Sequence, residues 1–589
     1  MSIPSPLNFK HLSYKTIKRA LQVFKKGAVF AIIGCAILTP SKAATPLKMR
    51  SFAAAYLAAR TAYSENNLDM AIRYYQEAQN FAPNNNEIQK DLFFISLIKG
   101  HFKDAVIQAE KLEKNELLER YPLLTLITDR LRAKRYTNLI PLLDKFSTVD
   151  VDIFSQTIIK GWVAFGRGNK EDALRTMEDT LKDTHYSFFG RYHLALLYDL
   201  LDKPTQAEEQ FKTLIGRRDG VGVPDTYAHI IISYASFLIR HGQRQKALDL
   251  LTKGEITLGD APILTKLRQK IAKGARPKPL IQTAQDGAGE LFYNLGTALK
   301  NTNVKRFAQF YLQFAAVLRP TDEDSLFALA QINARNKEYP QASALYKRFR
   351  PLSPHYNEAR LGLSIALGEM GHKKEAIAIL QKLVKADQNN SRARLTLGAF
   401  YMDENHYLKT IQTLDEALKH KASIEGAEWL FHFQRAIAYD KLKQWPKAAQ
   451  DLQQALNFAP ERVIVLNYYG YRLLERNEDL EHALALVQKA ADLAPDDSEI
   501  MDSLGWAYYK LGLYNKATTI LERAVQKNPD NSTINHHLGD TYWQTGRQTE
   551  ARFQWQRALA NDPSDEERAQ LQEKINKSFS FSQKLQIPH

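Results

Sequence analysis

The stretches SLGWAYYKLGLYNKATTILERAVQKNP (503–529) and HLGDTYWQTGRQTEARFQWQRALANDP (537–563) repeat one another with a shift of 34 residues. Proline closes these two copies and the two before them, at intervals of 35, 34 and 34 residues: Pro460, Pro495, Pro529 and Pro563. Two alanines per copy keep the same step: Ala448, Ala483, Ala517 and Ala551, then Ala455, Ala490, Ala524 and Ala558. A period of about 34 residues is typical of an array of two-helix units.

The chemistry of one copy predicts how its two helices meet. Apolar residues recur at helical spacing on both sides of Gly512. Glycine costs roughly 1 kcal/mol relative to alanine inside a helix, so Gly505 predicts a close contact between the helices. Ala517 is the matching small residue on the second helix. Gly512 is expected to end the first helix, and Pro529 the second, because proline cannot continue a helix.

The same pattern continues towards the N-terminus with less regularity. We assign about thirteen or fourteen units to residues 50–563, and we interpret 121–146 as a divergent helical pair. The residues that mark the earlier units are Ala71, Tyr75, Ala78, Pro83, Ala105, Ala173, Ala207, Ala247, Gly296, Ala308, Pro320, Ala342, Ala376, Gly398 and Tyr401. Each unit packs on its neighbours, so the length of 589 residues does not imply several globular domains.

These repeats resemble the tetratricopeptide repeat (TPR) family over nearly all of residues 50–563. The resemblance implies an all-α fold, a right-handed α-solenoid, that binds proteins and carries no catalytic site. LNYYGYRLLERNEDLEHALALVQKAADLAP, DSLGWAYYKLG and HLGDTYW are further similar to bacterial cell-envelope TPR proteins. That subset includes lipoprotein adaptors of carboxyl-terminal processing proteases, and the narrower likeness covers about residues 465–560.

The N-terminus is typical of an export signal. Residues 1–26 are basic and free of acids, and GAVFAIIGCAILTP (27–40) is apolar but shorter than the roughly 20 residues of a membrane span. We expect cleavage after Ala43 and a periplasmic protein. Two alternatives stay open: acylation at Cys35, within a lipobox-like IIGC, to give an outer-membrane lipoprotein, and an uncleaved anchor. A cytoplasmic scaffold is the third reading, and only this segment argues against it.

The charge and the cysteine content exclude several function classes. Removing residues 1–43 takes away seven basic residues and no acid, so the formal net charge falls from +15 to +8. The chain has no Lys/Arg run interleaved with aromatic residues, which argues against nucleic acid as a partner. Attraction to anionic lipid or glycan surfaces stays open. The one cysteine precedes the expected cleavage point, so disulfides and cysteine-based metal sites are not expected.

The expected organisation has one break and one cap. KIAKGARPKPLIQTAQDGAGE (270–290) contains prolines, glycines and clustered basic residues, and we interpret it as a hinge, with a long inter-repeat loop as the alternative. Ser564 and Glu567 form a capping box for a final helix whose acidic residues face water and whose Leu571 and Ile575 form an apolar edge. The predicted segments are the signal peptide 1–43, a divergent array 44–270, a linker 271–288, a regular array 289–563, a capping helix 564–579 and a disordered tail 580–589.

No catalytic motif is present in the sequence. It contains no glycine-rich phosphate loop, no HExxH, no GxSxG and no paired cysteine. The pair His536–His537 is a poor metal site, because adjacent helical residues point about 100° apart. We expect neither an enzyme nor a cofactor nor a bound metal.

The resemblance to TPR proteins implies that the first helix of each unit lines a concave face. Carried over by position, the lining residues are Asn467, Tyr468, Tyr471, Asp502, Trp506, Tyr509, His536, Asp540 and Trp543. The unit ending at Pro495 has one extra residue, and Tyr471 keeps its place only if that residue lies in the turn or the second helix. Aromatic and hydrogen-bonding groups of this kind are enriched in peptide-binding surfaces. The alternative is that Trp506 and Trp543 only fill space between helices.

We therefore expect an adaptor of the cell envelope that binds partner proteins of unknown identity and recruits a processing protease or a cell-wall hydrolase. A glycan- or lipid-facing module in polysaccharide export is the alternative. Asp502 and Asp540 at lining positions argue against a clamp for a C-terminal carboxylate. The oligomeric state does not follow from the sequence.

Overall fold

The computed structural model describes residues 50–65, 67–114, 119–146, 150–182, 187–216, 222–259, 261–302, 304–419 and 426–584. Over these ranges the regular elements are 30 α-helices and short 3₁₀ turns, with no strand. The expected signal segment 1–43, including Cys35, lies outside them, as do the last five residues of the predicted tail. The described chain divides into two compact units between His372 and Lys373.

The first unit contains six successive helix pairs, one unpaired helix, two further pairs and a final helix. Its elements are α2 (Phe52–Ser64), α3 (Leu68–Phe81), α4 (Asn86–Ile98), α5 (Phe102–Lys114), α6 (Arg120–Arg132), η2 (Tyr136–Leu139), α7 (Ile140–Leu143), α8 (Asp150–Gly166), α9 (Lys170–Asp179), η3 (Thr180–Lys182), α10 (Ser187–Leu200), α11 (Pro204–Ile215), α12 (Pro224–Arg240), α13 (Arg244–Leu258), α14 (Pro262–Ala272), α15 (Ala284–Leu299), α16 (Lys305–Leu318), α17 (Glu323–Arg335), α18 (Tyr339–Tyr346) and α19 (Tyr356–Glu369).

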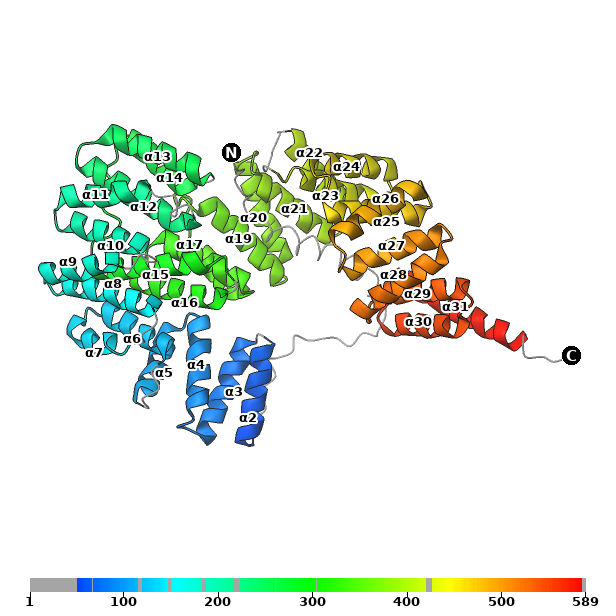
Figure 1. Ribbon diagram of the computed structural model, residues 1–589, viewed down its shortest axis with the longest axis horizontal. Helices are drawn as coiled ribbons and strands as arrows, with labels where there is room; N and C mark the ends of the chain where they lie inside the picture. Colours follow the sequence, from blue (N-terminus) through cyan, green and yellow to red (C-terminus); the bar gives the residue numbers. More distant parts are fainter. Residues whose placement is uncertain are drawn as a thin grey trace. The chain divides into compact units, whose positions relative to one another are not determined.

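The second unit continues the same order of short antiparallel helices (Figure 1). Its elements are α20 (Lys373–Ala386), α21 (Ser391–Asp403), α22 (Tyr407–Lys419), α23 (Trp429–Lys441), α24 (Trp445–Phe458), α25 (Val463–Arg476), α26 (Leu480–Leu493), α27 (Ser498–Lys510), α28 (Tyr514–Lys527), α29 (Ser532–Gln544), α30 (Gln548–Ala560) and α31 (Asp565–Lys584). Apart from α14 and α31, the described helices alternate as first and second helices of successive units, in agreement with the predicted repeat number.

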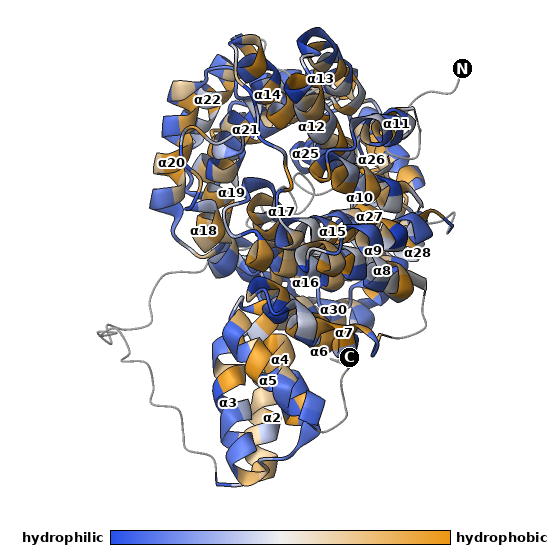
Figure 2. Ribbon diagram, turned by 90° about the vertical axis from the view of Figure 1, so that its left-hand side faces the viewer, coloured by the Kyte–Doolittle hydropathy of each residue, from blue (hydrophilic) through white to orange (hydrophobic). Residues whose placement is uncertain are grey.

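The repeat register predicted from the alanines is confirmed. The alanine assigned to each second helix is fully buried, from Ala71 in α3 to Ala551 in α30, and Thr410 takes this place in α22. A Cβ added at Gly505 would lie 2.5 Å from Leu521 Cγ, so the two helices of that unit approach too closely for any side chain there. Most helices carry both hydrophilic and hydrophobic residues, as Figure 2 shows, because only one face of each is buried.

The turn inside most of the described units has a residue in the left-handed region. Gly512 has φ +74°, and the equivalent Lys443 has φ +58° with the same hydrogen-bond pattern around it. Glycine adopts this conformation without cost, whereas an L-residue loses about 1 kcal/mol or more. The geometry of the unit thus persists where its glycine signature has been lost.

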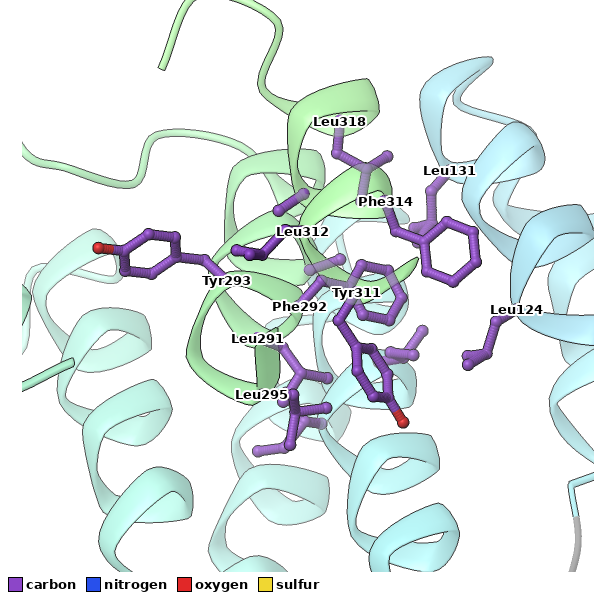
Figure 3. Packing of buried hydrophobic residues seen from close by; sticks show 14 of the residues in the cluster. Leu124, Leu131, Leu291, Phe292, Tyr293, Leu295, Tyr311, Leu312, Phe314 and Leu318 are labelled. Atoms are coloured by element: carbon purple, nitrogen blue, oxygen red, sulfur yellow. The ribbon is translucent and has the colours of Figure 1, made fainter. Parts of the chain in front are cut away.

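Helices α15 and α16 lie against the first helices of the preceding pairs. α15 contacts α6, α8, α10 and α12, and α16 contacts α4 and α6 (Figure 1). In Figure 3, Tyr311 and Phe314 of α16 point towards Leu124 and Leu131 of α6. The inner face of the first unit is therefore filled by a later part of the same chain.

The predicted linker 271–288 does not separate the two units. Its C-terminal part begins α15, in which every residue from Ala284 to Thr297 except Asp286 is buried. A Cβ added at Gly287 would lie 2.2 Å from the ring of Trp162 in α8, so this glycine serves packing and not flexibility. Residues 284–288 of the predicted linker are therefore packed helix, and the two compact units divide after His372; flexibility of residues 271–283 stays a prediction.

A charged network is buried where α15 meets α10, α12 and α16. The carboxylate of Glu290 accepts from Tyr192 Oη at 3.1 Å and from Arg319 Nη1 at 2.7 Å, and lies 2.9 Å from His229 Nδ1. The Glu290 side chain has no solvent exposure, and those of His229 and Arg319 are 2% and 5% exposed. Asp324 contacts the other ring nitrogen of His229 at 3.4 Å. The network ties four helices together through one carboxylate.

Helix α31 closes the second unit. Leu571 is fully buried and Ile575 packs on the same cluster, as expected from their spacing. The backbone N–H of Glu567 donates to Ser564 Oγ at 3.2 Å, which is half of the predicted capping box. The helix runs to Lys584, five residues into the segment predicted as a disordered tail.

Candidate binding surface

The predicted lining residues lie on three consecutive first helices of the second unit, α25, α27 and α29. The extra residue of the α25 unit falls at the end of that helix and in the turn after it, where Asn477 and Asp479 are both left-handed. Tyr471 precedes this point and so keeps its place on the first-helix face.

An aromatic stack runs across these helices. The Trp506 ring lies between His537, at 4.0 Å between centroids, and Tyr509, at 4.6 Å, and both pairs are nearly parallel. The ring centroid of Tyr471 lies 6.5 Å from that of His537, and the two rings are tilted by 43°. Trp506 is only 8% exposed, and its Nε1 donates to Glu475 at 3.1 Å. Trp506 is thus a packing residue, in line with the alternative considered from the sequence.

His537, which the sequence suggested only as a poor metal ligand, forms one side of this stack. Its Nδ1 lies 2.9 Å from Asp502 Oδ1, and both side chains are buried. Burial alone would lower the pKa of His537, but the charge and hydrogen bond of Asp502 outweigh it and raise the pKa above its ordinary value. A stacking partner of Trp506 two helices away could not be recognised from sequence spacing alone.

Two α25 residues of the predicted set differ in availability. Tyr468 is buried, and its hydroxyl donates to Asp440 Oδ2 at 2.8 Å, so it joins α25 to α23. Asn467 is half-buried, and its amide oxygen accepts no hydrogen bond from the residues that the structure describes.

Helix α31 covers His536 and Asp540. Lys574 Nζ lies 2.6 and 2.7 Å from the two carboxylate oxygens of Asp540 and 2.8 Å from His536 Nε2. Glu567 contacts His536 Nδ1 at 3.3 Å and is 16% exposed. The prediction that the acidic residues of this helix face water is therefore wrong for Glu567, because it packs against a histidine.

These contacts also revise the electrostatic argument made from the sequence. Asp540 is neutralised by Lys574, and Asp502 is paired with His537. Neither carboxylate presents an unbalanced negative charge, so the two aspartates do not repel an anionic group.

A pocket of about 320 Å³ opens where α27, α29, α30 and α31 meet. Its lining residues are Tyr509, Asp540, Trp543, Gln544, Trp555, Lys574, Lys577 and Ser578. The Trp543 and Trp555 rings lie 5.4 Å apart, and Trp555 Nε1 donates to Asp540 at 2.9 Å. Tyr509 and Trp543 are half-buried, so each shows part of its ring to solvent. The arrangement is that of an aromatic floor with ammonium groups at its rim.

Three of the nine predicted residues thus line this pocket: Tyr509, Asp540 and Trp543. The sequence reasoning missed Trp555, on a second helix, and Lys574, on the helix interpreted only as a cap. The described side chains include no group of His, Cys, Asp and Glu arranged to hold a metal ion. None of the helices between residues 50 and 584 has the length and apolarity needed to cross a membrane.

Models of the tetratricopeptide repeat match residues 52–85, 336–400 and 503–566. The chain is a TPR protein. Repeats of this family indicate a scaffold for protein–protein interactions, and such scaffolds are generally non-catalytic. The matched ranges lie in both compact units of this TPR chain.

Two curated relatives are similar to parts of this TPR chain. The TPR repeat-containing protein PA4667 of Pseudomonas aeruginosa is 27% identical over 188 residues, which are 32% of this chain and 31% of that protein. The Lipoprotein NlpI homolog of Haemophilus influenzae is 37% identical over 87 residues, which are 15% of this chain and 27% of that protein. The chain spans about a third or less of the length of these relatives. Among solved structures, a chain of the APC/C hetero-tetramer Cut9-Hcn1 has a TM-score of 0.37 at 13% identity, covering 90% of this chain and 97% of its own.

Proposed function

We propose that this TPR protein is a non-catalytic adaptor of the bacterial cell envelope that holds a partner protein at the pocket of its second unit. The observation that carries the proposal is the half-buried pair Tyr509 and Trp543 beside Lys574, because these two partly exposed rings share one pocket with a charged rim. The basic and apolar start of the sequence and the partial likeness to a lipoprotein support an envelope location.

The pocket is suited to a peptide segment of a partner. Partly exposed aromatic rings supply contact area at low cost in side-chain entropy, and such residues dominate the energetics of protein interfaces. The first unit offers no comparable inner face, because α15 and α16 occupy it. A processing protease or a cell-wall hydrolase is the partner class that we propose.

Cross-linking of intact cells, followed by purification of the tagged protein from the envelope fraction, tests the proposal. The informative variant combines Tyr509→Ala with Trp543→Ala. Its matched control combines Phe458→Ala with Phe553→Ala, which removes two aromatic rings that are 54% and 59% exposed in the same unit and line no part of the pocket.

We expect a specific protein to be recovered with the wild type and with the control variant and to be lost with the pocket variant, at unchanged helical circular dichroism. Equal recovery by both variants would refute the assignment of the pocket. Recovery of glycan or lipid without a protein would favour the alternative of an envelope polysaccharide module.

A further inference from the structure

The segment that follows α13 carries an unusual excess of positive charge. Residues 261–285 contain no acid and six basic residues: Lys266, Arg268, Lys270, Lys273, Arg276 and Lys278. Two of these have partners: Lys266 Nζ donates to the Ser353 carbonyl at 2.7 Å, and Arg268 pairs with Glu255 at 2.7 Å. The other four, here named the basic strip, are exposed and form no hydrogen bond or ion pair with the residues that the structure describes.

The basic strip is held in place although three of its four residues lie after the end of α14. Ser236 Oγ of α12 lies 3.1 Å from the Pro277 carbonyl and 3.0 Å from that of Lys278 and donates to them. Arg244 of α13 donates to the carbonyl of Ile271, at the end of α14, at 2.7 Å. The backbone that carries the four charges is therefore held at a defined place on the first unit, at the end of α14 and directly after it (Figure 1).

An apolar side chain protrudes on the same side of α14. Lys266 bonds the loop of residues 350–354, in which Leu352 is 90% exposed and Arg350 is also exposed. Lys266, Lys270 and Lys273 lie on one face of the helix, since their spacing of four and three residues is that of a helical stripe. The loop with Leu352 thus flanks the side of α14 on which Lys270 lies, with Lys273 directly after the end of the helix.

We propose that the basic strip and Leu352 form a docking surface for a bilayer that contains anionic phospholipid. Unpaired cations within a Debye length of one another act together on a negatively charged surface. An apolar side chain that protrudes among them has nowhere to insert on an acidic peptide, whereas the interface of a bilayer accepts it. The surface lies on the first unit and is independent of the partner pocket on the second.

Flotation of the full-length protein with lipid vesicles tests this surface. The quantity compared is a ratio, measured at roughly physiological salt. It is binding to phosphatidylcholine vesicles with 30 mol% phosphatidylglycerol divided by binding to pure phosphatidylcholine vesicles. This ratio cancels any contribution of the N-terminal segment that does not depend on lipid charge. The test variant is K270Q/K273Q/R276Q/K278Q. The matched control is K170Q/K374Q/K382Q/K385Q, which removes the same charge at exposed lysines elsewhere.

Each basic residue near an anionic surface strengthens binding by roughly fivefold. We expect the ratio to fall at least about tenfold for the test variant and to change less than about twofold for the control. Leu352→Ser should weaken binding to the anionic vesicles about threefold. An equal fall for test and control would overturn the proposal in favour of net charge alone, and no fall for the test variant would overturn it outright. Binding of the strip to polyglutamate but not to the vesicles would also overturn it and would indicate an acidic protein partner.

Discussion

Replacement of Glu290 by glutamine probes the buried charged network of the first unit most directly. The carboxylate faces His229 and Arg319, which are both almost completely buried. Removing one partner of a buried ion pair typically costs about 3–5 kcal/mol, because the opposite charge stays buried. Asp324 and Asp322 still pair with His229 and Arg319, at 3.4 and 2.8 Å. We therefore expect the lower end of that range, about 3 kcal/mol.

The same network predicts how the first unit responds to pH. Burial alone would raise the pKa of Glu290, but His229 and Arg319 lower it to about 2. Its contribution is therefore fully present above the unfolded pKa, about 4.3, and is lost as the pH falls towards 2. Burial alone would lower the pKa of His229, but Glu290 and Asp324 raise it to about 10. That contribution is fully present below about pH 6.5 and is lost as the pH rises towards 10.

Amide hydrogen exchange of residues 284–299, followed by mass spectrometry, measures the local stability of α15. The measurement does not require the two units to unfold together. A loss of about 3 kcal/mol corresponds to roughly a hundredfold faster exchange in α15, since 1.4 kcal/mol is a factor of ten. Protection in the wild type should be greatest between about pH 5 and 6.5. The control is Glu110→Gln, which changes an exposed carboxylate of the same unit. A change of less than threefold for Glu290→Gln would refute the assigned role of the network.

Three further outcomes are expected. Ala551→Leu should destabilise the last repeats by about 1–3 kcal/mol through overpacking, as measured by hydrogen exchange. Ala560→Leu, at an exposed position of the same helix, should not, and equal effects would contradict the repeat register. Lys443→Gly should stabilise the second unit by about 1 kcal/mol because it relieves a left-handed lysine, and a lower unfolding midpoint in urea would contradict this. Asp502→Asn should lower the pKa of His537, measured by exchange of the histidine C2 hydrogen, and an unchanged pKa would show that Asp502 does not set it.

The repeat architecture could be predicted because its constraints are local and recur. A small residue is required wherever two helices of a unit touch, so Gly505 and Ala517 show the contact directly in the sequence. The extent of the array could be followed through these positions even where the turn glycine was replaced, as at Lys443.

The filling of the first unit by α15 and α16 could not be predicted in the same way. Helix α15 is buried on almost all sides, so its polar residues Glu290 and Asn294 do not mark a solvent-facing side as they would in an ordinary amphipathic helix. The glycines of this helix then suggest a linker. The contacts that place this helix, such as that of Gly287 with Trp162, join residues far apart in the sequence.

The candidate site was predictable only in part for a related reason. Repeat positions identified the helices that carry Tyr509 and Trp543, but not which side chains would be covered. Whether Trp506 is buried depends on His537 two helices away, and the availability of Asp540 depends on Lys574 of α31. Charges on a terminal helix are usually solvated, so nothing in the spacing marks Lys574 as a partner.

The return of α16 to the start of the array sets an order for synthesis and folding. Arg120 donates to the hydroxyl of Tyr311, 191 residues later in the chain, and Gln309 reaches the carbonyl of Ile98 across 211 residues. In most solenoids each repeat contacts only its neighbours, so folding can begin in the repeats that have already been made. Here the first helices emerge with their inner apolar side uncovered until residues 284–318 have been made. At a synthesis rate of about 5–20 residues per second, that apolar side stays uncovered for about ten seconds or longer. During this interval a chaperone or an export factor has a surface to bind.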